Sequence, residues 1–291
     1  MNSWIRILRP INGVMGLVAT WISGFIGVGY RLPYYFIALL IASISVFLVT
    51  SAGNVLNDIL DQDTDKINHP NRPIPSGEIS IKSAKMYSTA LFIIPFVIII
   101  PGTVTGIYSV FVPIIVLLAE LLLISYETRT KNIGLWGNAT VSVLVGLIFI
   151  YGGVSVGAIA PMVILFVLAA LSNFSREVIK DIEDMGGDSD RITFPKKHGV
   201  RMASTVATSS IVIAVVISVF PFLLGIFPYP YLVVVLVADI IFLFSVHKIP
   251  ENPKRSQTYS KYAMITALVA YVVGAIALEF ISSVSLISIS W

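Results

Sequence analysis

Long apolar stretches recur from one end of the chain to the other and are separated by short polar segments. Most are about 20 residues long, the length an α-helix needs to cross a lipid bilayer. They lack the two-residue alternation of polar and apolar side chains that marks the strands of a membrane barrel. Because a segment in lipid must satisfy its own backbone hydrogen bonds, this pattern predicts an all-α polytopic membrane protein.

The apolar stretches predict nine transmembrane helices, separated at several points by turn signals such as Pro101-Gly102 and Gly152-Gly153. Their predicted ranges are 11–30, 34–58, 85–103, 107–126, 135–154, 160–180, 204–224, 230–246 and 262–282. The connecting segments are too short to bury a core of their own. We therefore expect residues 1–291 to form a single transmembrane domain.

Composition agrees with a location in lipid. Of the 291 residues, 56% are apolar and 12% are charged, and the mean hydropathy is +0.91. The absence of cysteine excludes disulfides, thiolate chemistry and cysteine-ligated metals. The first apolar run is long and lacks a small-residue cleavage site, so a retained first helix is expected rather than a signal peptide.

The basic residues divide unevenly between the two sides of the predicted helices. Every lysine and arginine except Arg31 falls at the N-terminus or in an even-numbered loop. The positive-inside rule then predicts an integral protein of the cell membrane with a cytoplasmic N-terminus and an outer C-terminus.

The acidic pattern Asp-Ile-x-Asp-x-x-x-Asp occurs twice, each time at the end of an apolar stretch. The two copies contain Asp58, Asp61 and Asp65, and Asp181, Asp184 and Asp188. If each helix continues through its copy, the acids share one face, with Asn54 and Asn57 in the first copy, whereas Glu183 in the second points elsewhere. Two carboxylates about 4 Å apart repel by roughly 4 kcal/mol at an effective dielectric of about 20. A cation is therefore expected at this cytoplasmic end.

Oxygen donors without cysteine favour Mg²⁺ over zinc or copper, and Mg²⁺ is commonly shared between carboxylates and a substrate's phosphates. Basic residues in the same loops could bind phosphate oxygens, although each could instead mark topology or contact lipid headgroups. These residues are Arg72, Arg129, Lys131, Arg176 and Lys180. Together they predict a site for a polyanion on a metal.

The stretch from Asn57 to Asp65, with the following Asn71-Arg72-Pro73-Ile74-Pro75-Ser76-Gly77, resembles the first signature of the UbiA superfamily of intramembrane prenyltransferases. Lys180 to Asp188 resembles the second signature, and Tyr126 to Lys131 resembles the third, basic segment. The resemblance covers nearly the whole chain. It implies helices arranged around a central cavity and Mg²⁺-dependent transfer of a prenyl group from an allylic diphosphate.

The resemblance also implies roles for individual residues. The implied metal ligands are Asn57, Asp58, Asp61, Asp65, Asp181, Asp184 and Asp188, with Asp61, Asp65, Asp184 and Asp188 also catalytic. Arg72, Lys131 and Lys180 match diphosphate-binding positions. Further substrate-binding candidates are Asn12, Asn54, Tyr126 and Asn138. The alternatives are a helix cap for Asn12, an interfacial anchor for Tyr126 and an interhelical hydrogen bond for Asn138.

The second signature looks most like the archaeal branch that joins geranylgeranyl diphosphate to geranylgeranylglyceryl phosphate, forming digeranylgeranylglyceryl phosphate for ether lipids. An aromatic or chlorophyllide acceptor is the alternative within the family. A membrane cation or phosphate transporter is an alternative of another class, but it should place its coupling residues near the bilayer midplane. We expect a prenyl diphosphate, a lipid-like acceptor and membrane lipids as partners, and no nucleic acid.

Overall fold

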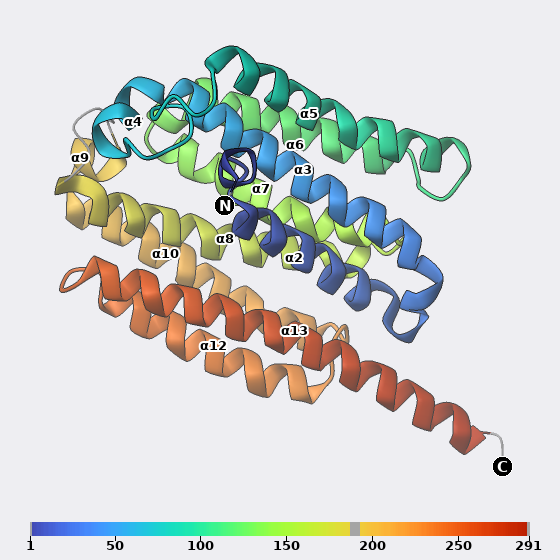
Figure 1. Ribbon diagram of the computed structural model, residues 1–291. Helices are drawn as coiled ribbons and strands as arrows, with labels where there is room; N and C mark the ends of the chain where they lie inside the picture. Colours follow the sequence, from blue (N-terminus) through green and yellow to red (C-terminus); the bar gives the residue numbers. More distant parts are fainter. Residues whose placement is uncertain (1, 187–192, 290–291) are drawn as a thin grey trace. The chain divides into compact units, whose positions relative to one another are not determined.

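The computed structural model describes residues 2–186 and 193–289, which form helices joined by short turns, with no strand among them (Figure 1). The α-helices are α1 (Ser3–Arg6), α2 (Pro10–Val28), α3 (Phe36–Leu60), α4 (Gln62–Asn68), α5 (Ile81–Val104), α6 (Phe111–Thr128), α7 (Leu135–Val154), α8 (Ala160–Glu183), α9 (Phe194–His198), α10 (Val200–Ser218), α11 (Phe220–Leu223), α12 (Tyr229–His247) and α13 (Pro253–Ile289). Short 3₁₀ segments occupy Gly29–Tyr35, Thr130–Asn132 and Asp184–Gly186. The predicted all-α membrane fold is confirmed.

Within the described residues, eight helical stretches are long and apolar enough to cross a membrane, so the predicted number of nine is not confirmed as such. The difference lies in the 51-residue stretch Pro10–Leu60, which counts once. It contains α2 and α3, which run antiparallel. A Cβ placed on Gly13 would lie 2.5 Å from the Phe47 ring, and one placed on Gly24 would lie 2.5 Å from Leu39. The early part of α2 therefore packs on the middle of α3, and the late part of α2 packs on the start of α3.

The chain divides into two compact units. The first unit consists of Met1–Gly24, Pro33–Arg129 and Leu147–Ala158, and the second of Phe25–Leu32, Thr130–Gly146 and Ile159–Trp291. Helix α7 contributes its second half to the first unit and its first half to the second. A single domain around a central cavity stays a prediction.

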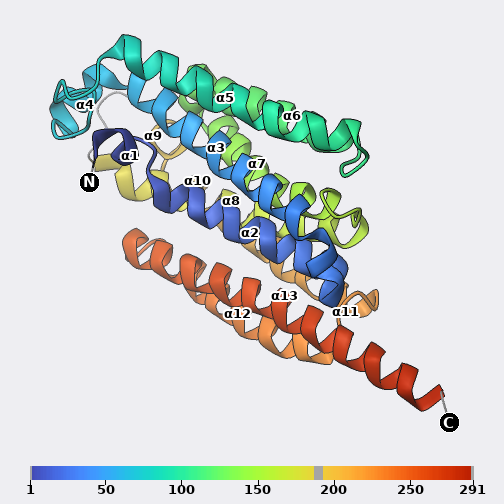
Figure 2. The same cartoon turned by 45° about the vertical axis from the view of Figure 1, so that its right-hand side comes forward.

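In the first unit, α3 lies beside α5 in both views of the ribbon (Figures 1 and 2). The Ser88 hydroxyl, near the start of α5, donates to the carbonyl of Ala52 in the later part of α3 at 3.2 Å. Ile99, near the end of α5, belongs to the same buried cluster as Ala42 near the start of α3, so the two helices run antiparallel. Helix α6 approaches α3 closely at Gly53, where an added Cβ would lie 2.6 Å from Leu123. Buried side chains, including Val55 of α3 and Leu91 of α5, pack between α3 and α5. The C-terminal end of α3 is thereby fixed.

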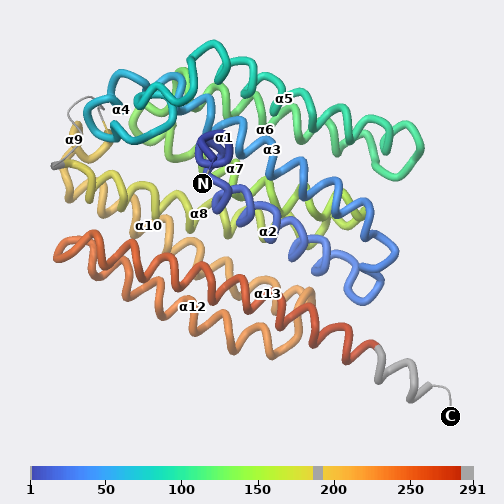
Figure 3. Tube along the Cα trace, in the orientation of Figure 1, coloured from blue at the N-terminus to red at the C-terminus, as the bar shows by residue number. Residues whose placement is uncertain are grey.

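In the second unit, α8 packs antiparallel on α10, and α12 packs antiparallel on α13, as the chain trace in Figure 3 shows. The Ser210 hydroxyl of α10 donates to the carbonyl of Leu171 in α8 at 2.8 Å. Val178 and Ile179 of α8 are fully buried against α10 residues such as Ala203. This packing fixes the C-terminal end of α8, where the second acidic motif begins.

Candidate active site

The first acidic motif lies where α3 ends and α4 begins. Helix α3 ends at Leu60, and Asp61 separates it from α4 with φ −92° and ψ 11°. The helix therefore does not run unbroken through the motif, but the four-residue hydrogen-bond pattern continues across the break. The Asp61 N–H donates to the carbonyl of Asn57 at 2.9 Å, and the Asp65 N–H donates to that of Asp61 at 2.8 Å. Residues spaced by four thus keep to one side of the chain.

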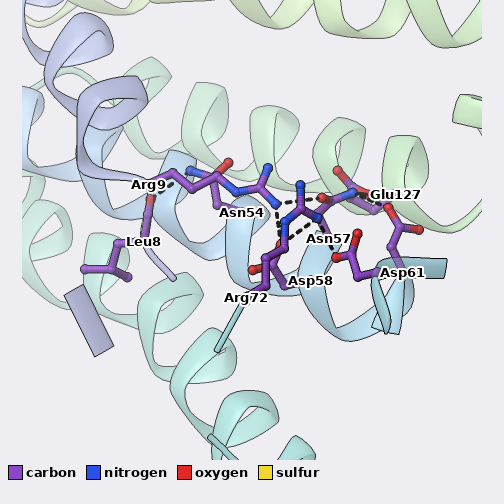
Figure 4. Close-up of polar contacts among 9 residues, drawn as sticks. Leu8, Arg9, Asn54, Asn57, Asp58, Asp61, Arg72 and Glu127 are labelled. Atoms are coloured by element: carbon purple, nitrogen blue, oxygen red, sulfur yellow. Dashed lines mark hydrogen bonds and ion pairs between the residues drawn. The ribbon is translucent and has the colours of Figure 1, made fainter. Parts of the chain in front are cut away.

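Asn57 is the centre of a side-chain network at this end of α3 (Figure 4). Its Nδ2 donates to Asp61 Oδ2 at 2.8 Å and to Glu127 Oε2 of α6 at 2.9 Å. Its Oδ1 accepts a hydrogen bond from Arg9 Nη2 at 3.3 Å. An amide that donates to two carboxylates has its orientation determined by them, because only its nitrogen can donate.

Two arginines contact the buried acids of the network. Asp58 is 1% exposed and Asp65 is 4% exposed. Arg9 forms an ion pair with Asp58 Oδ1, and Arg72 forms one with Asp65 Oδ2. Arg72 Nη1 also lies 3.6 Å from Asp58 Oδ1. Buried carboxylates require such partners, because desolvation otherwise disfavours the charged form.

The donor chemistry of this cluster fits a divalent cation. The four carboxylates Asp58, Asp61, Asp65 and Glu127 outnumber the guanidinium groups of Arg9 and Arg72 by two. Hard oxygen donors with an excess of negative charge suit Mg²⁺. No three Asp, Glu, His or Cys side chains in the part of the chain that the structure describes are already arranged to hold a metal. The arginines contact Asp58 through Oδ1 and Asp65 through Oδ2, so a metal held by either acid would be expected on its other oxygen.

The second acidic motif lies at the end of α8, in the second unit. Asp181 Oδ2 accepts a hydrogen bond from Asn138 Nδ2 of α7 at 2.9 Å. Glu183 Oε2 accepts one from Gln257 Nε2 of α13 at 3.0 Å, so the two acids point to different helices, as helical periodicity predicts. Asp184 begins the 3₁₀ segment and is exposed. Asp188, the last residue of this motif, lies outside the described residues.

Basic side chains of the second unit lie close to this motif in the sequence. Arg176 Nη2 donates to Glu177 Oε1 at 2.5 Å, and its Nε donates to the buried Asn173 at 3.4 Å. Lys180 is exposed in the last turn of α8. Lys131 is half-buried in the 3₁₀ segment before α7. A diphosphate-binding role for these residues stays a prediction.

Other predicted residues have structural contacts or exposed positions. Asn54 Nδ2 donates to the carbonyl of Leu8 at 2.8 Å, which fastens the N-terminal segment to α3. Asn12 is exposed within the first turn of α2 and does not precede the helix, so it is not its N-cap. Tyr126 is half-buried in the last turn of α6, and Arg129 is exposed just after that helix. The interhelical hydrogen bond considered for Asn138 is present, and its partner is a motif acid.

The structure adds two residues that the sequence does not single out. From the sequence, Arg9 contributes only to the prediction of membrane topology, yet in the structure it contacts both Asn57 and Asp58. Glu127 is buried, 7% exposed, and bonds to Asn57 from 70 positions away in the chain. An acid in the last turn of an apolar helix, next to Tyr126 of the basic segment, was the available signal for Glu127.

The chain is similar to known proteins over nearly its whole length. The UbiA prenyltransferase family matches residues 16–269. A digeranylgeranylglyceryl phosphate synthase from Methanosphaera stadtmanae is 35% identical over 283 residues, which cover 95% of this chain and 100% of the relative. A solved structure of a digeranylgeranylglyceryl phosphate synthase is similar with a TM-score of 0.83 and 31% identity, covering 94% of this chain and 98% of the other. A UbiA homolog from Archaeoglobus fulgidus, solved with GPP and Mg²⁺ bound, has a similar fold with a TM-score of 0.72, at 17% identity and with 94% and 99% of the two chains covered.

Proposed function

Because the chain belongs to the UbiA prenyltransferase family, we propose that it transfers a geranylgeranyl group from geranylgeranyl diphosphate to geranylgeranylglyceryl phosphate. The product is digeranylgeranylglyceryl phosphate, a precursor of archaeal ether lipids. The observation that carries this proposal is the similarity to synthases of that name over nearly the whole length of both chains. The family membership makes a transporter the weaker reading of the paired acidic motifs.

The reaction needs an allylic carbon–oxygen bond to break and an ether bond to form. The diphosphate leaves with the bonding electron pair, and its charge grows as the bond breaks. The acceptor's hydroxyl oxygen then bonds to the allylic carbon, and its proton passes to a motif carboxylate or to the released diphosphate. A carbocation-like electrophile does not require a strongly activated nucleophile, so no Ser-His-Asp relay is needed.

The first unit supplies one set of ligands for this reaction. Asn57, Asp58, Asp61 and Asp65 would hold Mg²⁺, which when bound neutralises charge on the diphosphate oxygens. Arg72 lies against Asp65 and would bind the diphosphate through its remaining N–H groups. The apolar helices of the membrane would exclude water from the allylic cation.

The second unit supplies the other proposed ligands. Asp181, Asp184 and Asp188 would complete the metal set, and Lys131, Arg176 and Lys180 would bind diphosphate oxygens together with Arg129 from the end of α6. The hydrogen bond from Asn138 holds Asp181 in one orientation, which supports a role for both residues at the site.

The eight apolar helices among the described residues and the family membership indicate that this chain is an integral membrane protein. Its location in the cell membrane, with the N-terminus and the active site on the cytoplasmic side, is part of the proposal. It is supported by the distribution of lysine and arginine, of which only Arg31 falls in the predicted outer loops.

A direct assay of purified protein tests the proposed reaction. The protein is incubated with Mg²⁺, geranylgeranyl diphosphate and a panel of acceptors, and the products are identified by mass spectrometry. We expect the doubly prenylated glyceryl phosphate, and no turnover after EDTA removes the metal. Product from a phenolic or chlorin acceptor alone would keep the prenyl transfer and reject the proposed acceptor.

A further inference from the structure

A pocket of about 300 Å³ lies beside the network of α3 in the first unit. It is lined by three arginines, Arg6, Arg9 and Arg72, and by polar residues of the loop after α4 that include His69 and Asn71. Asp58 is the acid among its lining residues. The volume is at the lower end of the range of about 300–1,000 Å³ for small-molecule sites. A small polar headgroup fits this size, whereas a geranylgeranyl chain must lie elsewhere.

The arginines of the pocket are held by carboxylates and retain further donors. Arg6 Nη2 lies 2.7 Å from Glu78 Oε1, and the other two arginines pair with motif acids. Each guanidinium carries five N–H groups, so one or two ion-pair contacts do not exhaust it. Arg6 Nε is buried and has no hydrogen-bond partner within the described residues. The Arg6 side chain as a whole is 38% exposed and lines the pocket, so its other N–H groups are available to an anion there.

The backbone at Arg9 is also unusual. Its φ of 48° is the one positive φ among the described residues other than glycine. The left-handed region is unfavourable for a side chain of this size, and Pro10 restricts the residue before it further. The hydrogen bond from Asn54 to the carbonyl of Leu8 holds the adjoining backbone. Strain that the surrounding structure maintains is typical of ligand sites, and here it accompanies an arginine that lines the pocket.

We infer that this headgroup pocket, defined by Arg6, Arg9, Arg72, His69 and Asn71, binds a phosphate group, namely that of the phosphorylated acceptor. The inference rests on the proposed function, which supplies an acceptor with one phosphate monoester. Guanidinium groups bind phosphate oxygens through paired N–H donors. Arg9 and Arg72 contact motif carboxylates and also line the pocket, so a phosphate here lies next to the predicted metal ligands. Arg72 has enough N–H groups to contact both this phosphate and the diphosphate that we propose it binds. The prenyl diphosphate carries the same chemistry and is the other source that the experiment must distinguish.

The test compares geranylgeranylglyceryl phosphate with geranylgeranylglycerol, which has the same chain and hydroxyl without the phosphate. We expect Arg6→Gln to lower kcat/KM for the phosphorylated acceptor by roughly 10- to 100-fold, the loss typical of a hydrogen bond to a charged group. The kcat/KM for the unphosphorylated acceptor and the KM for the prenyl diphosphate should stay within about twofold of wild type. Glu78→Gln is the matched control, because it removes the partner of Arg6 and keeps the arginine. It should preserve the preference for the phosphorylated acceptor.

Two results would overturn the inference. An equal fall for both acceptors would give Arg6 a structural role only. A higher KM for the prenyl diphosphate with unchanged acceptor kinetics would assign the pocket to the donor.

Calorimetric titration of full-length protein with glycerol phosphate separates this inference from the proposed function. Binding by the wild type that Arg6→Gln abolishes, without product from the phosphorylated acceptor, would keep the pocket and reject the proposed reaction. Absence of binding by the wild type would reject the pocket itself.

Discussion

The ion pair between Arg9 and Asp58 joins the start of α2 to the end of α3, and Arg9→Met removes its cation while keeping much of the side-chain volume. Asp58 is 1% exposed, so its carboxylate stays away from water after the substitution. Arg72 remains 3.6 Å from Asp58 Oδ1 and gives partial compensation. The substitution therefore leaves a buried carboxylate with a weaker partner.

The size of the effect follows from the burial of the two partners. Removing one partner of a buried ion pair costs about 3–5 kcal/mol. The Arg9 side chain is 32% exposed, and Arg72 remains near Asp58. We therefore expect the free energy of unfolding to fall by about 3 kcal/mol, the lower end of this range. At roughly 2 °C for each kcal/mol in a chain of this length, Tm should fall by about 6 °C. Adding Asp58→Asn to Arg9→Met removes the uncompensated charge and should restore about half of this loss.

Thermal unfolding of the full-length protein in detergent, followed by the fluorescence of its four tryptophans, measures these changes. Arg201→Met is the matched control, since Arg201 is exposed at the start of α10 and should change Tm by less than about 1 °C. A double variant no more stable than Arg9→Met would refute the reasoning, because the loss would then not come from an unpaired Asp58.

Three further predictions concern individual contacts. Glu127→Gln keeps an acceptor for Asn57 Nδ2 and should retain most turnover, whereas Glu127→Leu leaves one hydrogen bond unmade and should lower kcat by about tenfold or more, as steady-state kinetics would show. Gly152→Ala would place a Cβ 2.8 Å from the backbone carbonyl oxygen of Thr20 in α2, which cannot rotate away, and should destabilise the protein by roughly 1–3 kcal/mol, measured as a fall in Tm; an unchanged Tm would mean that α2 has room to move. Hydrogen bonds from Ser3 and then from Arg6 hold the pKa of Glu78 below its usual 4.5, so Glu78 stabilises the fold above pH 4.5 and loses this effect as pH falls through the lower, folded pKa. The Tm difference between wild type and Glu78→Gln should accordingly be present at neutral pH and vanish in acid, and a difference that grew in acid would contradict the assignment.

The helices were predictable because lipid leaves the backbone few alternatives. The predicted range 34–58 became α3 at Phe36–Leu60, and 230–246 became α12 at Tyr229–His247. The range 262–282 was too short, since α13 begins at Pro253. Hydropathy detects the apolar part of a helix and misses a polar turn that continues it, as the first turns of α13 with Lys254 and Arg255 illustrate.

The site was predictable only where local periodicity decides it. The divergence of Asp181 and Glu183 follows from helical spacing and is confirmed by their different partners. The network around Asn57 depends on Glu127 of α6 and on Arg9, both far from Asn57 in the sequence. The contact of Glu127 with Asn57 joins residues 70 positions apart, and such pairings are not encoded in any short motif.

The central claim is that both acidic motifs act on the same Mg²⁺-bound diphosphate. Calorimetry with a non-reactive geranylgeranyl thiodiphosphate, in the presence and absence of Mg²⁺, tests it on wild type, Asp61→Asn, Asp184→Asn and the double variant. We expect Mg²⁺-dependent binding that each single substitution weakens, with a double variant little weaker than either single one, because the two residues share a ligand. Binding that does not depend on Mg²⁺, or losses that simply add, would contradict the claim.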